Sequence, residues 1–355
     1  CFINKRIKLI MAYSTINKSS SYFNTLLYTG NGSTNALTGV GFKPDFTWIK
    51  SRSVSRNHKL FDIVRGVTKV IGSNESDAES TVATSLTAFG SDGFTVSSDV
   101  SVNENSATLA AWNWLAGGSQ GSSNTDGSIN TAYTSANTTS GFSISKYTGT
   151  GANATVGHGL GAVPKMILTK NLDQGSEGWL VYHASLGNTK TINLNSNGTT
   201  GTNTSFWNDT TPTSSVFSVG TNHGSNGPSH NMIAYCFAEK TGYSKIGSYT
   251  GNGDADGPFV YCGFKPTFIL TKQSSASGEG WQMHDSKRIG YNPDNNQFYA
   301  NTDGTEATGD YLNIFSNGFK ITNTNSVING NNATYIYMAI GQSIVGSNNV
   351  PCNAR

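Results

Sequence analysis

One ten-residue pattern occurs three times in this chain and constrains every other interpretation of it. The copies are GFKPDFTWIK at 41–50, GAVPKMILTK at 161–170 and GFKPTFILTK at 263–272. A Tyr-Thr-Gly-x-Gly sequence precedes each copy, at 28–32, 147–151 and 249–253. Two ordered motifs that recur together indicate a domain present in three diverged copies. Such a chain is more often a binding or structural protein than a single-site enzyme.

The repeat predicts where the domains begin and end. We expect an upstream leader at 1–10, a first β-repeat at 11–118, a linker rich in Gly, Ser, Asn and Thr at 119–140, a second β-repeat at 141–242, a third at 243–343 and a C-terminal tail at 344–355. Met11 is interpreted as the natural start, and the ten residues before it as upstream sequence. That segment also lacks the apolar region of a secretory signal. The linker composition predicts a flexible or loosely strapped connection.

Within each copy the local patterns are those of strands and turns. Segments such as FSISKY at 142–147 alternate apolar and polar residues, which is typical of a half-buried strand. The closing runs ATLAAWNWLA at 107–116, MIAYCFAE at 232–239 and TYIYMAIG at 334–341 are apolar on both faces, so we expect central strands covered on both sides. Turn residues return every 8–12 residues, a spacing that predicts an all-β sandwich or barrel.

Composition argues against several classes of partner. Charged residues make up 12% of the chain and the formal net charge is +2, so the chain lacks the basic footprint of a nucleic-acid binder. No stretch approaches 18 apolar residues, and we expect no membrane insertion. The sequence holds no recognisable nucleotide, hydrolase or zinc motif, and we expect no cofactor.

The acidic residues that recur are interpreted as structural. Aligning the copies places Asp62, His183 and Asp285 at one position, with Arg65, Leu186 and Arg288 three residues later. Because the acid and the arginine are lost together, they are interpreted as an ion pair rather than as catalytic groups. No catalytic residue is assigned. A glycosidase remains an alternative, since two carboxylates can be brought together by the fold without any sequence spacing.

Metal and thiol chemistry have weak candidates only. Asp254 and Asp256 resemble the start of a calcium loop, but Lys265 stands where the twelfth-position Glu is expected, so a turn is favoured. His223 and His230 share a loop without a ligand spacing. Cys236 and Cys262 are expected to be buried small hydrophobes rather than a disulfide.

Aromatic residues provide the candidate binding surface. Trp179 and Trp281 occupy one repeat position, which favours core packing, whereas Trp207 has no counterpart and lies in the polar loop TNTSFWNDTTPT at 202–213. An aromatic ring among amides and hydroxyls is suited to stacking on a sugar. Trp207, Asn208 and Asp209 are therefore the candidate glycan-binding residues, with core capping by Trp207 as the alternative.

The long motifs also resemble a known repeat family. The start MAYSTINKSSSYFNTLLYTGNGS, the block TGVGFKPDFTWIKSRS and the segment IAYCFAEKTGYSKIGSYTGNG are similar to a family common in marine bacteriophages, especially cyanophages. The resemblance implies a tail-fibre-like or other virion structural protein, with three small lectin-like antiparallel β-sandwiches of the concanavalin or jelly-roll type. It supplies no catalytic residues.

These observations lead to one leading hypothesis and several alternatives. We expect a phage virion protein, a tail-fibre or adhesin component, whose loops bind host surface polysaccharide. Its partners would be other virion proteins and further copies of itself, with a trimer favoured by the class. The alternatives are a capsid-decoration or head-fibre protein that binds only virion subunits, and a polysaccharide depolymerase.

Overall fold

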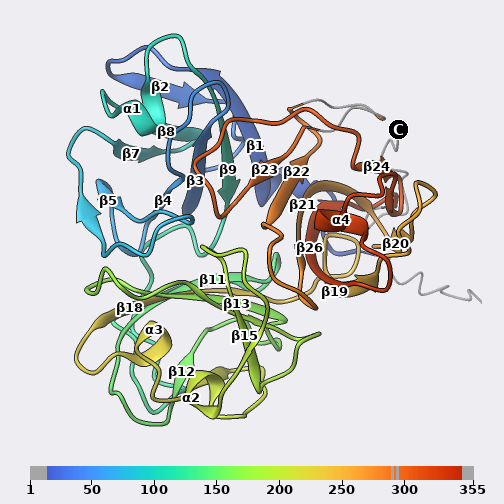
Figure 1. Ribbon diagram of the computed structural model, residues 1–355. Helices are drawn as coiled ribbons and strands as arrows, with labels where there is room; N and C mark the ends of the chain where they lie inside the picture. The colour runs from blue at the N-terminus through green and yellow to red at the C-terminus, as the bar shows by residue number, and fades with distance from the viewer. Residues whose placement is uncertain (1–13, 289–291, 293–295, 346–355) are drawn as a thin grey trace, which may run out of the picture.

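The computed structural model describes residues 14–288, 292 and 296–345. The expected leader at 1–10 and most of the expected tail lie outside these residues. Figure 1 shows three β-rich lobes arranged around a common centre, which we call segment 1 (11–118, blue to teal), segment 2 (141–242, green to yellow) and segment 3 (243–343, orange to red). The protein is an antiparallel all-β protein built from stacked sheets, as the strand patterns predict.

Each segment has an inner sheet with the same strand order. In segment 1 it is β1-β9-β3-β4, in segment 2 it contains β11-β18-β13-β14, and in segment 3 it contains β19-β26-β21-β22. These strands are β1 (Phe23–Thr29), β3 (Phe46–Ser51), β4 (Lys59–Asp62), β9 (Thr108–Trp114), β11 (Phe142–Thr148), β13 (Met166–Asn171), β14 (Leu180–His183), β18 (Asn231–Phe237), β19 (Ser244–Thr250), β21 (Lys265–Gln273), β22 (Gln282–Asp285) and β26 (Thr334–Gln342).

A smaller outer sheet packs on each inner sheet. The outer sheets are β2-β8-β7, β12-β17 and β20-β25-β24. Their strands are β2 (Asn35–Thr38), β7 (Leu86–Gly90), β8 (Gly93–Val96), β12 (Ala154–Gly157), β17 (Val216–Val219), β20 (Phe259–Tyr261), β24 (Leu312–Phe315) and β25 (Gly318–Ile321). The remaining elements are η1 (Ser19–Ser21), β5 (Lys69–Val70), β6 (Ser80–Thr81), α1 (Val100–Asn103), β10 (Tyr133–Asn137), β15 (Lys190–Asn193), β16 (Gly201–Thr202), α2 (Thr204–Trp207), α3 (His223–Asn226), β23 (Phe298–Tyr299) and α4 (Ser326–Asn329).

The closing strands are covered on both faces, which confirms their prediction as central strands. In β18, Met232, Ala234 and Cys236 face the core between the two sheets of segment 2. The alternate residues Ile233 and Tyr235 face a second core that all three segments share. β9 and β26 divide their side chains in the same way. This shared core unites the three inner sheets into one body, so each segment is buried from two sides.

The Tyr-Thr-Gly-x-Gly motif anchors the end of each first strand to the helical turn before the closing strand. Tyr28 Oη donates to the Val102 carbonyl at 2.6 Å, and the buried Asn103 accepts the Asn31 N–H at 3.0 Å. The same two contacts recur in segments 2 and 3. A Cβ on Gly30 would lie 2.1 Å from the Glu104 carbonyl oxygen, so the close approach of backbones requires glycine there.

The segment predicted as a linker takes part in the fold. Within 119–140, β10 pairs with β11 and extends the inner sheet of segment 2 by an edge strand. A flexible connection does not fit this stretch, whereas a strap along segment 2, which was the other expectation, does. Its serines, threonines and glycines satisfied the composition of a linker, but backbone hydrogen bonding along a sheet edge needs no apolar pattern.

Candidate functional site

The recurring acids and arginines are buried ion pairs. The side chains of Asp62 and Arg65 are fully buried, and so are those of Asp285 and Arg288. Arg65 donates from Nε to the Asp62 carboxylate and from Nη2 to the Leu60 carbonyl at 2.9 Å. Burial is the largest single influence on the pKa of Asp285, and it raises the pKa. The charge of Arg288 and the hydrogen bonds to the carboxylate together outweigh burial, so the pKa of Asp285 lies below its usual value. These carboxylates are hydrogen-bonded inside the protein and do not face a substrate-accessible surface.

Each pair also receives a hydrogen bond from a neighbouring segment. Tyr235 of segment 2 donates from Oη to Asp62 of segment 1 at 2.7 Å. Trp112 of segment 1, at the repeat position equivalent to Tyr235, donates from Nε1 to Asp285 of segment 3 at 3.0 Å. The third equivalent residue is Met338, which cannot donate, and the acid it would face is replaced by His183. These two contacts link segment 2 to segment 1 and segment 1 to segment 3, and a contact of His183 with the Tyr337 carbonyl closes the ring.

The ring explains why the acid and the arginine change together. His183 Nδ1 accepts the Ser185 N–H at 3.2 Å, and Nε2 lies 3.2 Å from the Tyr337 carbonyl oxygen, to which it donates. Burial lowers the pKa of His183 to about 4, so the ring is neutral and needs no charged partner. Leu186 then packs against the shared core where the other segments carry arginine.

A second set of equivalent side chains closes the same ring. Trp179 donates from Nε1 to the Gly72 carbonyl of segment 1 at 2.8 Å, and Trp281 donates to the Asn193 carbonyl of segment 2 at 2.9 Å. His58 occupies the third position, where Nδ1 accepts the Trp48 N–H at 2.8 Å and Nε2 contacts the Tyr299 carbonyl of segment 3 at 3.1 Å. The prediction that Trp179 and Trp281 are core residues is confirmed.

The terminal lysine of each decapeptide is also buried. Lys50, Lys170 and Lys272 each donate from Nζ to the carbonyl of the following residue, at 2.9, 3.1 and 2.8 Å. Lys50 also reaches the Asp303 carbonyl of segment 3, and Lys170 reaches the Ser76 carbonyl of segment 1. Burial lowers the pKa of each lysine to about 8. Two of the three repeated lysines, Lys50 and Lys170, thus link their segment to another one.

The expected sugar-stacking position of Trp207 is wrong. Its side chain is 1% exposed, packs against Tyr182 and donates from Nε1 to the Lys190 carbonyl at 3.0 Å. Trp207 belongs to the core of segment 2, which is the capping alternative. Asn208 and Asp209 follow it with φ angles of 49° and 44°, so they form the left-handed turn that ends α2. The Trp207 indole is therefore not available to stack on a sugar.

The metal candidates have turn geometry. The Asp254 carboxylate accepts the Asp256 N–H at 2.9 Å, and the Asp254 N–H is accepted by the Asn252 side chain at 3.0 Å. Asp256 pairs with Lys320, whose hydrogen bond lowers the pKa of Asp256. His223 and His230 lie edge to face, with His230 Nδ1 3.0 Å from the Asn171 amide nitrogen. No group of three or more potential ligands occurs among the described residues.

Both interior cysteines are buried and unpaired, as predicted. Cys262 lies at the position of Val40 and Leu160, which are buried as well. Burial raises the pKa of the Cys262 thiol to about 12. The thiolate is the nucleophilic form of cysteine, and a raised pKa makes that form scarce, so Cys262 is a poor nucleophile.

An exposed aromatic cluster lies on the outer sheet of segment 3, where the sequence analysis placed no site. Phe259 is 47% exposed, Tyr261 62% and Phe315 41%. Phe259 and Phe315 contact each other with ring centroids 6.0 Å apart. Cross-strand register places Tyr261 and Phe315 on either side of Gly318. The Phe259 ring lies over this glycine, since a Cβ on Gly318 would lie 3.0 Å from Phe259 Cζ.

Polar side chains share this face. In the strand register, Lys320 of β25 lies opposite Phe259 of β20 on one side and opposite Asn313 of β24 on the other. The exposed ion pair of Lys320 with Asp256 lies at the same edge. We call the six residues Phe259, Tyr261, Asn313, Phe315, Gly318 and Lys320 the aromatic platform. It combines three apolar ring faces with an amide, an ammonium and a nearby carboxylate.

The platform belongs to segment 3 alone. The positions equivalent to Phe259 and Tyr261 are Ala36 and Thr38 in segment 1 and Thr155 and Gly157 in segment 2, as the pairing of β2 with β8 and of β12 with β17 shows. Phe315 corresponds to Gly90. Since the same sheet forms with small residues twice, the fold does not require aromatic side chains here. No spacing in the sequence separates Phe259 and Tyr261 from buried strand aromatics, so the strand register is needed to find them.

The fold and its sites thus define a protein of stacked antiparallel β-sheets with three equivalent segments around one core. A family model described as a domain of unknown function, DUF7483, matches residues 18–343. The chain belongs to this family, whose model spans all three segments as one unit. A search of curated proteins finds no match. Among the described residues, no helix is both long and apolar enough to span a membrane.

Proposed function

We propose that this chain is a non-catalytic virion structural protein, a tail-fibre or adhesin component, that binds host surface glycans through the aromatic platform of segment 3. The observation that carries the proposal is the exposure of three aromatic residues where the equivalent positions of the other segments hold small residues. Clustered exposed apolar groups on an otherwise polar surface mark interaction sites. The virion role rests on the resemblance of the repeat motifs to phage proteins.

The chemistry of the platform suits a sugar better than a purely apolar ligand. Phe259, Tyr261 and Phe315 can stack against the C–H faces of pyranose rings. Lys320 lies beside them, and its ammonium can hydrogen-bond sugar hydroxyls. An aromatic side chain with a polar rim gives contact area at a low cost in conformational entropy.

The position of the acids supports a binding role. The carboxylates that recur in the sequence, Asp62 and Asp285, are buried in ion pairs that also take hydrogen bonds from another segment. A glycosidase needs two carboxyl groups about 5–10 Å apart on either side of an accessible bond. These two acids do not flank an accessible site. The platform is therefore proposed as a place of recognition rather than of cleavage.

A glycan array probed with the intact chain tests the proposal. Specific retention on a defined set of bacterial surface polysaccharides is the expected result, without release of reducing ends over prolonged incubation. Absence of binding on an array that covers lipopolysaccharide and capsule structures would favour the capsid-decoration alternative. Immunogold labelling of virions locates the protein: label on the tail is expected, and label on the capsid alone would overturn the tail-fibre assignment.

A further inference from the structure

The three inner sheets differ in what pairs with the outer edge of their first strand. In segment 2, β10 covers the edge strand β11, with Ser135 opposite Ile144. In segment 3, the Glu239 carboxylate accepts the N–H of Ile246, the residue equivalent to Ile144, at 2.8 Å. The equivalent residue in segment 1 is Thr25 of β1. No described strand pairs with this edge of β1.

The covering of β11 continues into the junction between segments 2 and 1. Upstream of β10, the Gly118 N–H donates to the Asp45 carboxylate at 2.7 Å. The Gln120 side chain donates from Nε2 to the Val64 carbonyl at 3.0 Å. The stretch 117–137 is therefore an extended strap that pairs with one segment and binds the next segment around the ring.

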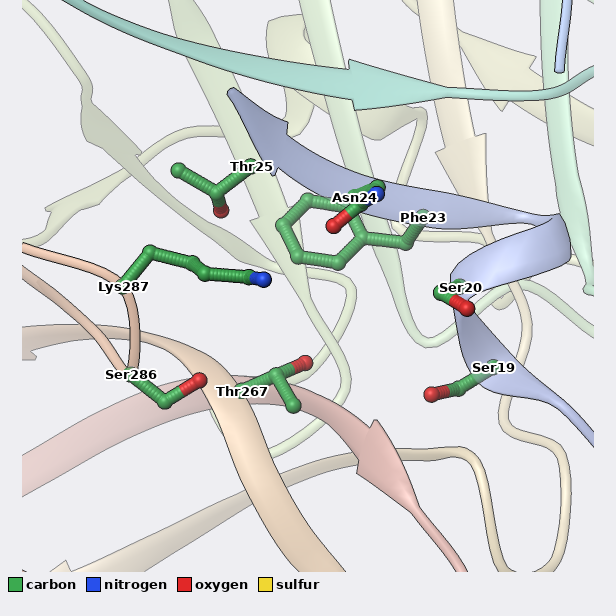
Figure 2. A pocket seen from close by; sticks show the side chains of 8 residues that line it. All are labelled: Ser19, Ser20, Phe23, Asn24, Thr25, Thr267, Ser286 and Lys287. Carbon is green, nitrogen blue, oxygen red and sulfur yellow. The ribbon is translucent and has the colours of Figure 1, made fainter. Parts of the chain in front are cut away.

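An open cleft occupies the corresponding place between segments 1 and 3. It has a volume of about 280 Å³ and is lined by residues of η1, β1, β21 and the turn after β22. Figure 2 shows them: Ser19, Ser20, Phe23, Asn24, Thr25, Thr267, Ser286 and Lys287. Phe23, Asn24 and Thr25 are equivalent to Phe142, Ser143 and Ile144, which β10 pairs in segment 2. The cleft thus lies where a strap would run.

The floor of this cleft differs from its covered counterpart in charge. Lys287 stands where segment 1 has Val64, and Thr267 stands where it has Asp45. Figure 2 shows the Lys287 ammonium directed into the cleft, toward Asn24. Among the described residues no carboxylate lies within ion-pairing distance of Lys287. The cleft therefore offers an edge of β1 that no described strand pairs with, although the Phe23 and Thr25 side chains are largely buried, and an ammonium that has no carboxylate partner within the described part of the chain.

We propose that this cleft binds an extended strand of a partner polypeptide, which pairs with β1 as β10 pairs with β11 and places a carboxylate opposite Lys287. Main-chain pairing at a sheet edge supplies affinity, and the charge selects the partner. The inference is independent of glycan binding, because the cleft and the aromatic platform share no residue. It identifies β1 as an attachment point for another protein.

A peptide copied from the strap tests the proposal. The probe is a fluorescent peptide with the sequence of residues 117–137 in which Gln120 is replaced by Glu. The Gln120 amide donates to the backbone carbonyl of Val64, the residue equivalent to Lys287. Glu gives up that donation and brings a carboxylate beside the backbone of Lys287, where the ammonium can turn to it. Binding to the intact chain is measured by anisotropy. We expect saturable binding that weakens at least tenfold in the Lys287→Glu variant. A second peptide with Lys at that position should restore affinity for Lys287→Glu.

Two further measurements locate the binding. The Lys190→Glu variant, which reverses an exposed charge on segment 2, is the matched control and should bind the peptide unchanged. Hydrogen exchange should show new protection of the Thr25 amide when the peptide binds. The proposal is overturned if the acidic peptide does not bind at millimolar concentration, if Lys287→Glu binds it equally well, or if protection appears away from β1.

Discussion

Tyr235 donates a hydrogen bond from its hydroxyl to the buried carboxylate of Asp62, which lies in a different segment, at a distance of 2.7 Å. Asp62 also pairs with Arg65, and both side chains are fully buried. The Tyr235 contact therefore connects the shared core to an ion pair that is shielded from water. The hydroxyl therefore contributes to the association of two segments and not only to its own sheet.

Removing this hydroxyl should destabilise the whole chain. Tyr235→Phe leaves a buried carboxylate with one hydrogen bond fewer, and we expect a loss of about 1–3 kcal/mol in the free energy of unfolding. Urea denaturation measures it. Tyr133→Phe on β10, where the ring is 39% exposed, is the control and should change stability by less than about 0.5 kcal/mol. Equal effects of the two substitutions would contradict the assigned role.

Removing one partner of the Asp62–Arg65 ion pair should lower the free energy of unfolding more than replacing both partners. Arg65→Leu alone leaves the Asp62 charge buried without its partner, and we expect about 3–5 kcal/mol of destabilisation. The double variant Asp62→His with Arg65→Leu copies the His183 and Leu186 arrangement of segment 2. It should be more stable than Arg65→Leu alone. A double variant that is less stable than the single variant would show that the segments are not interchangeable at this site.

Buried histidines should make the fold sensitive to acid. Burial lowers the pKa of His183 to about 4 and that of His284 to about 3, from an ordinary value of 6.5. Between pH 6.5 and 4 the unfolded chain therefore binds more protons than the folded chain, so stability falls as the pH falls. Burial raises the pKa of Asp45 to about 6, so the folded chain binds one proton at this residue before the unfolded chain does. That proton acts in the opposite direction and reduces the loss of stability. Denaturation at pH 6.5, 5.5 and 4.5 should show the net loss.

His284→Phe provides a specific check on that prediction. Both ring nitrogens of His284 lack a hydrogen-bond partner among the described residues, and the equivalent residue of segment 1 is Phe61. The variant should be more stable than the parent at every pH. Its stability should also change less between pH 6.5 and 4.5, by up to about 1.4 kcal/mol per pH unit for one proton. An unchanged pH dependence would mean that the pKa of His284 is the same in the folded and unfolded chains, which contradicts the effect of burial.

The buried lysines should make the stability of the folded chain rise with pH in mild alkali. Each of Lys50, Lys170 and Lys272 has a pKa lowered to about 8, so above pH 8 the folded chain releases protons that the unfolded chain keeps until about pH 10.5. Stability should rise between pH 8 and 9. Above pH 9 the raised pKa of Cys236 opposes the gain, because the unfolded thiol ionises first.

Replacing one lysine should reduce the rise. Lys272→Met removes a group that titrates in this window, and the slope of unfolding free energy against pH should fall by up to about 1.4 kcal/mol per unit. Lys190→Met, on an exposed strand position, is the control and should leave the slope unchanged. The account fails here if Lys272→Met and the parent chain have the same slope from pH 8 to 9.

Much of the fold follows from local pattern. Closing strands such as Asn231–Phe237 are apolar on both faces, and the structure covers both faces as expected. The burial of Cys236 and Cys262 follows from their repeat positions. The joint replacement of Asp and Arg by His183 and Leu186 indicated a structural pair, but the donors Tyr235 and Trp112 lie in other segments and no local spacing reveals them.

The sequence-based site prediction failed for a different reason. Trp207 lies among polar residues, yet the short helix α2 turns its indole into the core of segment 2. Polar neighbours along the chain did not report on the direction of the side chain. Phe259 and Tyr261 resemble ordinary strand residues in the sequence, and only the register of the outer sheet shows that both face outward beside Phe315.

The most direct test of the proposed function compares the aromatic platform with its equivalent in segment 1. The triple variant Phe259→Ala, Tyr261→Thr, Phe315→Gly copies Ala36, Thr38 and Gly90, residues that the same sheet already accommodates. Its affinity for the array-selected glycan is measured by calorimetry beside that of the parent chain. We predict at least a hundredfold loss of affinity in a variant that is somewhat less stable than the parent chain but still folded at the assay temperature. Equal affinity of the two proteins would contradict the claim that the platform binds the glycan.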